Sequence, residues 1–140
     1  MSEKDIWIQS ALQFLNVPYL WGGYTPLEGL DCSGLAQELM RMLGLDPPED
    51  QTAMDLMNHF MKEGASEIVD AGALAFYGTA NRISHVGTLL GPSLMIEAAG
   101  GDSKTTTLAG ALKSDARIRI RPYKYRRDLV RVLRPKGIPW

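Results

Sequence analysis

The chain has 140 residues, of which 45% are hydrophobic and 22% charged, and its formal net charge is −1. These values are typical of one soluble globular domain, and they exclude a disordered chain, a fibre and a coiled-coil rod. The sequence lacks the stretch of roughly 18 apolar residues that a membrane-spanning helix requires. We therefore expect a single domain over residues 1–140 with no membrane partner.

The N-terminal half of the chain has the periodicity of helices. Two segments place apolar residues on one helical face, and Pro18 and Gly44 terminate them: Trp7, Ala11, Phe14 and Leu15, then Leu35, Leu39, Met42 and Leu43. A third helix follows, because Thr52 and Asp55 have the spacing of a capping box. It extends to Gly64.

The C-terminal half has the pattern of strands. Short apolar or alternating runs predict five of them: Ala73–Tyr77, Ser84–Leu90, Leu94–Ala99, Arg117–Arg121 and Leu129–Leu133. Gly91, Pro92 and Ser93 lie between the second and third runs and indicate a hairpin turn. Helices followed by strands predict an α+β fold with an antiparallel sheet packed against helices.

The positive charge of the chain is concentrated at its C-terminal end. From Arg117 onward nine basic residues stand against Asp128 alone, a charge of +8, so residues 1–116 carry −9. The nine are Arg117, Arg119, Arg121, Lys124, Arg126, Arg127, Arg131, Arg134 and Lys136. Such a cluster indicates either a contact with an anionic partner or a strand with a solvated basic face. The alternation of arginine and isoleucine favours the solvated strand.

Cys32 is the single cysteine of the chain, so an internal disulfide and a thiolate-rich zinc site are both excluded. It stands where the second predicted helix begins. The free N–H groups and partial positive charge of a helix start stabilise a thiolate and can hold an oxyanion. Asp31 can cap that helix. Position alone also fits a small buried core residue, so Cys32 is a candidate nucleophile at this stage.

A thiolate nucleophile needs a base, and the two histidines of the chain are His59 and His85. His59 is predicted on a helix surface, whereas His85 lies in a strand. If Gly91–Ser93 forms a three-residue loop, His85 and Glu97 lie diagonally on one sheet face. Glu97 could then accept a hydrogen bond from the imidazole and orient it, as the third member of a triad does. The alternative is that Glu97 points to solvent from an edge strand.

Three motifs now occur in a recognisable order: Pro18-Tyr19-Leu20-Trp21-Gly22-Gly23, Asp31-Cys32-Ser33-Gly34 and Ser84-His85-Val86-Gly87. Together they resemble the NlpC-type cell-wall cysteine peptidases, a papain-like family, over about residues 18–99. The resemblance implies a central antiparallel sheet with the cysteine at a helix N-terminus. It implies cleavage of amide bonds in peptidoglycan stem peptides, most often between γ-linked D-glutamate and diaminopimelate or lysine. It gives no reason to invoke a metal ion or an organic cofactor.

The resemblance also implies roles for individual residues. Cys32 corresponds to the nucleophile, His85 to the general base, and Tyr19 to a tyrosine that lines the oxyanion and substrate site. Three residues correspond to substrate-binding positions: Asp31, Ser33 and Trp21. Asp31 would contact the amino end of the substrate.

Two departures from the family pattern keep other interpretations open. Glu97 stands where the family usually has a histidine, which would also suit a catalytically idle structural domain of a phage tail or assembly complex. The polar N-terminus, Met1–Asp5, lacks a secretory signal. It predicts cytoplasmic synthesis and action on the cell wall after export, injection or incorporation into a virion, with a phage tail or secretion system as partner.

Two further functions are alternatives to the peptidase. A thiol acyltransferase on the same scaffold is disfavoured, because here the histidine follows the cysteine in the chain. A nucleic-acid binder would depend on the basic C-terminal end alone, where Tyr123 and Tyr125 are the only aromatic residues interleaved with the basic ones. We therefore expect no nucleic-acid partner.

Overall fold

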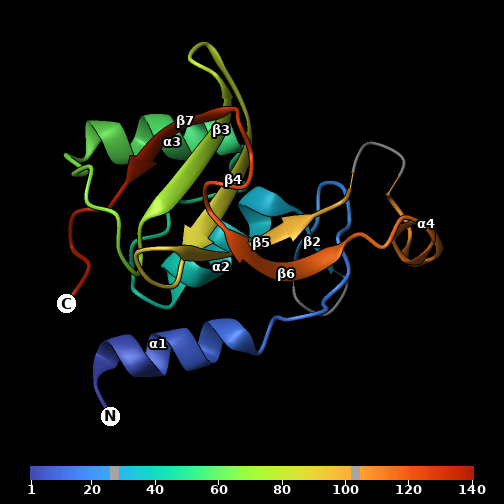
Figure 1. Ribbon diagram of the computed structural model, residues 1–140, viewed down its shortest axis with the longest axis horizontal. Helices are drawn as coiled ribbons and strands as arrows, with labels where there is room; N and C mark the ends of the chain where they lie inside the picture. Colours follow the sequence, from blue (N-terminus) through green and yellow to red (C-terminus); the bar gives the residue numbers. More distant parts are fainter. Residues whose placement is uncertain (26–28, 102–104) are drawn as a thin grey trace.

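The computed structural model describes residues 1–25, 29–101 and 105–140 (Figure 1). Its elements are α1 (Glu3–Leu12), β1 (Tyr24–Thr25), β2 (Gly29–Leu30), α2 (Cys32–Arg41), α3 (Ala53–Lys62), β3 (Leu74–Thr79), β4 (Arg82–Leu89), β5 (Leu94–Ala99), α4 (Leu108–Lys113), β6 (Arg117–Pro122) and β7 (Leu129–Leu133). The predicted α+β class and antiparallel sheet are confirmed. The β1–β2 hairpin and α4 were not predicted from the sequence.

The main sheet has five strands in the order β6-β5-β4-β3-β7, and each neighbouring pair is antiparallel. The β4–β5 pairing joins Thr88 to Ile96, and the Leu90 N–H donates to the Leu94 carbonyl at 2.8 Å. This register leaves a three-residue loop at 91–93, as predicted. It places His85 and Glu97 on the same face of the sheet.

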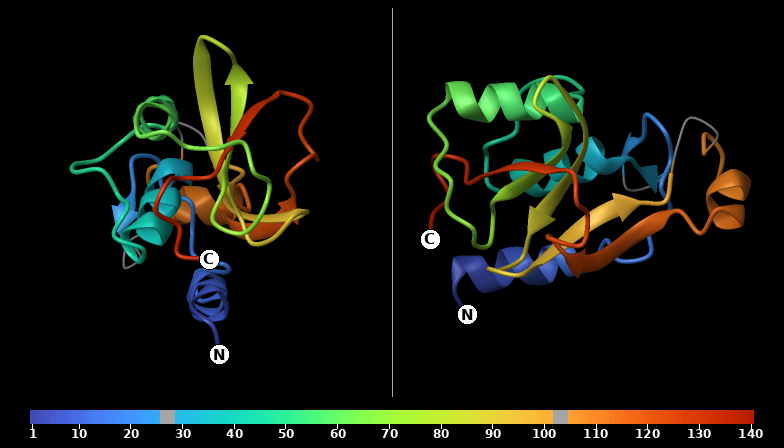
Figure 2. Two further views of the ribbon diagram at one scale, coloured as in Figure 1. Left: turned by 90° about the vertical axis from the view of Figure 1, so that its left-hand side faces the viewer. Right: turned by 45° about the horizontal axis from the view of Figure 1, so that its top comes forward.

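Two apolar clusters cover the two faces of the sheet. Helices α2 and α3 lie together on one face (Figure 2), and the larger cluster fills the space between them and the strands. Leu35 and Leu39 of α2 belong to this cluster together with Phe76 and Ile96, all fully or almost fully buried. Burying one such side chain stabilises the fold by about 2 kcal/mol. The smaller cluster on the opposite face contains Tyr77.

The ends of the helices follow their capping residues. The Thr52–Asp55 capping box is present at α3, as predicted. Gly44 has a φ of +70°, and the turn it makes after α2 is the predicted C-terminal stop. The first helix is shorter than predicted, because α1 ends at Leu12 and turns, including Asn16 at a φ of +70°, lead to Pro18.

Helix α1 is tied to the rest of the fold by Trp7. Its indole N–H donates to the Leu39 carbonyl at 2.9 Å, and its ring lies 5.4 Å from that of Trp140. Both ends of the chain therefore pack against the same core. Among the described residues, no helix has the length and apolar character needed to cross a membrane.

Candidate active site

Cys32 is the first residue of α2 and is partly exposed. The Asp31 carboxylate caps the helix by accepting from the Gly34 N–H at 2.7 Å, and the Ser33 hydroxyl donates to it at 3.2 Å. The N–H groups of Cys32 and Ser33 belong to the first turn, where a helix has no internal acceptor for them. They lie beside the thiol, at the positive end of the helix dipole. A developing oxyanion could be held there.

His85 and Glu97 make a short polar contact on the sheet side of the site. The imidazole Nε2 lies 2.6 Å from Glu97 Oε1, and the Glu97 side chain is fully buried. The paired residues of β4 and β5 end at Thr88 and Ile96, so this contact lies beyond the last pair, where the strands separate. The hairpin register that the sequence predicted thus brings His85 and Glu97 together, and solvent exposure of Glu97 is excluded.

The surroundings of His85 favour its protonated form. Burial opposes protonation, but the hydrogen bonds that His85 makes to Cys32 and Glu97, and the charges of those groups, outweigh it and raise the pKa of His85 to about 9. Because Nε2 faces Glu97, Nδ1 is the nitrogen left for the Cys32 thiol. The three side chains therefore form a thiol–imidazole–carboxylate series in which Glu97 stabilises an imidazolium.

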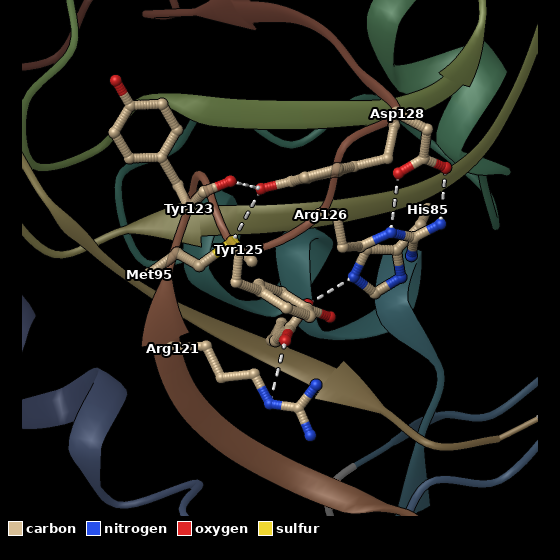
Figure 3. A network of polar contacts seen from close by, with 9 residues as sticks. His85, Met95, Arg121, Tyr123, Tyr125, Arg126 and Asp128 are labelled. Atoms are coloured by element: carbon tan, nitrogen blue, oxygen red, sulfur yellow. Dashed lines mark hydrogen bonds and ion pairs between the residues drawn. The ribbon is translucent and has the colours of Figure 1, made fainter.

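A tyrosine and an arginine also lie close to the buried carboxylate of Glu97 (Figure 3). The Tyr125 hydroxyl lies 3.4 Å from Glu97 Oε1, and Arg121 Nε lies 3.8 Å from Oε2. The Arg121 guanidinium also stacks on the Tyr125 ring, 4.8 Å from its centroid. The basic strand is therefore not simply a solvated face, because Arg121 reaches the buried carboxylate across β6 and β5.

Tyr77 packs against the imidazole ring of His85, within the network of polar contacts drawn in Figure 3. The Tyr77 ring packs at 5.5 Å from that of His85, and its hydroxyl donates to the Tyr123 carbonyl at 2.6 Å. Burial raises the pKa of Tyr77 well above its usual range, so it stays a neutral donor. The Arg126 guanidinium lies over the Tyr77 ring, 5.1 Å from its centroid. It also pairs with the Asp128 carboxylate through contacts of 2.7 and 2.9 Å.

Two hollows meet at Cys32, and Tyr19, Trp21 and Ser84 line both. We call the first the acidic arm, about 290 Å³, which includes Asp31, Ser33, Asp50 and Gln51. We call the second the basic arm, about 240 Å³, which includes His85, Arg121, Tyr125 and Arg126. The thiol therefore stands between two spaces of opposite charge.

Burial raises the pKa of Asp31 on the acidic arm above its usual range. Hydrogen bonds from Gly34 and Ser33 oppose the rise, and the nearby charge of Asp50 adds to it. In the described parts of the chain, no group of three or more histidine, cysteine, aspartate and glutamate residues is arranged to hold a metal ion.

The structure brings all the sequence-predicted site residues to this region. Tyr19 is 6% exposed and lies at the junction of the arms, whereas Trp21 is 54% exposed at their mouth. Sequence reasoning missed Arg121 and Tyr125, and it also missed Gly101. A Cβ at Gly101 would overlap the Tyr19 ring, so this glycine allows the ring to occupy its place. The alternation of arginine and isoleucine predicts that Arg121 lies on the polar face of its strand. It does not predict that Arg121 pairs with Glu97.

The site thus combines an antiparallel sheet, a helix packed on it, and a cysteine at the helix start near a strand histidine. The match to known families agrees with this arrangement. The model of the NlpC/P60 family matches residues 16–121, and the chain belongs to this family.

Two curated relatives come from Bacillus subtilis (strain 168). The chain is 32% identical to the Gamma-DL-glutamyl hydrolase over 104 residues, which are 70% of this chain and 24% of the relative. It is 35% identical to the Bifunctional muramidase/DL-endopeptidase CwlT over 91 residues, which are 63% of this chain and 27% of the relative. The chain thus spans about a quarter of the length of these relatives.

Solved structures share the fold. The NlpC/p60 domain of the peptidoglycan hydrolase SagA superposes with a TM-score of 0.65 at 17% identity, covering 94% of this chain and 98% of that one. An NlpC/P60 family protein from Bacillus cereus ATCC 10987 gives a TM-score of 0.71 at 19% identity, covering 99% and 41%. The expected NlpC-type fold is therefore confirmed.

Proposed function

We propose that this chain is a cysteine endopeptidase that hydrolyses amide bonds in peptidoglycan stem peptides. The observation that carries the proposal is the buried 2.6 Å contact between His85 and Glu97 beside the thiol of Cys32. Family membership and the names of the relatives, a glutamyl hydrolase and a DL-endopeptidase, support it. The bond we propose joins γ-linked D-glutamate to diaminopimelate or lysine.

In the proposed reaction the Cys32 sulfur attacks the carbonyl carbon of this bond. The N–H groups of Cys32 and Ser33, together with Tyr19, stabilise the oxyanion that forms. His85 transfers its proton to the leaving nitrogen, so the C–N bond breaks and a thioester remains. Water then attacks the thioester while His85 accepts its proton, and the acid is released as the thiol–imidazole pair is restored. Glu97 orients the imidazole throughout and stabilises its charge.

The remaining predicted residues serve substrate binding in this proposal. Asp31 and Ser33 line the acidic arm, where a free amino group at the start of the substrate would be attracted. The exposed indole of Trp21 would cover the substrate at the mouth of both arms. Because Trp7 and Trp140 pack together, we propose that residues 1–140 form one peptidase domain. Its delivery to the wall by a phage tail or secretion system stays a prediction.

Mass spectrometry tests the proposal directly. The purified protein is incubated with diaminopimelate-type and lysine-type stem peptides, and Cys32→Ala serves as the control. We expect one new pair of fragments from the wild-type protein and none from the variant, with matching circular dichroism spectra for the two. Intact peptides of both types after incubation with the wild-type protein would contradict the proposal and favour an idle structural domain or an acyltransferase.

A further inference from the structure

The two arms differ in charge, and this difference affects which substrate residue can occupy the leaving-group side of the cleaved bond. This inference deepens the proposed function and rests on it. In the proposed reaction His85 donates its proton to the leaving nitrogen, so the leaving residue must lie on the imidazole side of Cys32. His85 lines the basic arm, whereas the residues of the acidic arm surround the start of α2. The residue on the leaving side of the bond therefore occupies the basic arm.

Two guanidinium groups line the basic arm, and they differ in what they already bind. Arg126 pairs with the Asp128 carboxylate through both Nε and one terminal nitrogen. Arg121 faces Glu97 through Nε at the longer distance of 3.8 Å and contacts the Tyr125 side chain. A guanidinium has five N–H donors, so these contacts leave donors on Arg121 for a ligand. One third of its side chain is exposed.

The two acidic residues near the basic arm, Glu97 and Asp128, leave Arg121 able to bind an anionic ligand. Glu97 is fully buried, and its carboxylate is engaged by His85 and Tyr125 as well as by Arg121. Asp128 is paired with Arg126. The His85 imidazolium adds a further positive charge at the inner end of the arm. A ligand entering this space meets the remaining N–H donors of Arg121, because both acids are already paired.

We propose that Arg121 binds the side-chain carboxylate of the leaving residue and so makes the chain selective for diaminopimelate over lysine. The two side chains both end in an amine, but diaminopimelate carries a carboxylate on the same carbon. A carboxylate matches the planar fork of a guanidinium, and the hydrogen bonds are charge-assisted. The unbalanced amine of lysine would instead face like charges on Arg121 and His85.

The test compares three stem tetrapeptides that differ only in the leaving residue: diaminopimelate, diaminopimelate with its side-chain carboxylate amidated, and lysine. Each is followed by D-alanine, so the main-chain carboxyl is never free at this residue. The measured quantity is kcat/KM for each peptide. We expect the wild-type protein to prefer the free carboxylate over the other two by about tenfold or more, the usual scale of a hydrogen bond between charged groups.

Arg121→Gln should bring the three kcat/KM values to within about threefold of one another. Because Arg121 also contacts Glu97, this variant will be slower on every peptide, and the ratio between peptides separates recognition from that general loss. Arg117→Gln is the matched control. Arg117 lies on the same strand, is 40% exposed and does not line the basic arm, so its removal should leave the ratio unchanged.

The outcomes distinguish this inference from the proposed function. Similar kcat/KM values for the three peptides in the wild-type protein would overturn the role of Arg121 and leave the peptidase intact. A carboxylate preference that survives Arg121→Gln would also overturn it. Cleavage of none of the three by the wild-type protein would overturn the proposed function and this inference together. The comparison of carboxylate with carboxamide uses only the wild-type protein, so it does not depend on folding of a variant.

Discussion

The acidic and basic arms meet at the same sulfur but are assembled differently. The polar side chains that distinguish the acidic arm come from two short pieces of chain, residues 31–33 and residues 50–52, each at the start of a helix with its own capping side chain. The basic arm takes His85 from β4 and Arg121 from β6, and Glu97 of β5 is buried in contact with both. Local capping therefore positions the nucleophile, whereas strand register positions the base and its partners.

This difference predicts different consequences of substitution. On the acidic arm a side chain can be replaced by another good cap with little effect on stability, because the helix start depends on local hydrogen bonds. On the basic arm, by contrast, each functional side chain is held by several residues that are distant from it in the chain. A change there should alter activity even when it does not touch the thiol.

The largest effect of this kind is expected for Gly101→Ala. The added Cβ would overlap the Tyr19 ring and force it away from Cys32. We expect kcat/KM to fall about tenfold or more, because small displacements at a reacting centre are costly. Unfolding free energy should fall by about 1–3 kcal/mol, as for other overpacked sites. Stem-peptide hydrolysis and denaturant unfolding measure the two quantities.

Gly91→Ala is the matched control for that substitution. A Cβ at Gly91, in the β4–β5 turn, meets open space. It should leave both quantities close to wild type. If Gly101→Ala behaves like Gly91→Ala, the packing of Tyr19 does not govern activity.

A smaller effect separates the two roles of Asp31. Asparagine caps helices as well as aspartate does, so Asp31→Asn should keep the unfolding free energy near wild type, whereas Asp31→Ala should lower it by about 1 kcal/mol. Both variants remove the charge that would attract the amino end of the substrate. Both should therefore raise KM for peptides with a free N-terminus. A KM that is unchanged in Asp31→Asn would restrict Asp31 to capping.

The sequence predicted the acidic arm more fully than the basic arm, for a physical reason. Capping boxes and glycine stops are local, so the ends of α2 and α3 follow from adjacent residues. The His85–Glu97 contact could also be predicted, because a three-residue loop fixes the register of one hairpin. Arg121 and Tyr125 could not be placed, since their positions depend on β6 pairing with β5 and on the loop before β7.

The unpredicted elements are short. Strands β1 and β2 have two residues each, and α4 has six, so none is long enough for its hydrophobic pattern to repeat several times. Gly101 was missed for a related reason. Its importance comes from the Tyr19 ring that packs on it, and that ring is distant in the chain.

Glu97 acts with Cys32 to keep His85 protonated, and the pH dependence of Glu97→Gln tests this role of Glu97 most directly. The folded-state pKa of His85 is about 9, above its ordinary 6.5, so the imidazolium persists through neutral pH and is lost as pH rises through about 9. The kcat/KM of the wild-type protein should therefore fall on the alkaline side near pH 9.

Glutamine keeps the shape of the side chain and a carbonyl acceptor, but it removes the negative charge. The alkaline limb of Glu97→Gln should move to lower pH, with a lower maximal rate and little change in substrate binding. An alkaline limb at the same pH in both proteins, with equal maximal rates, would contradict the assignment of Glu97 to the triad.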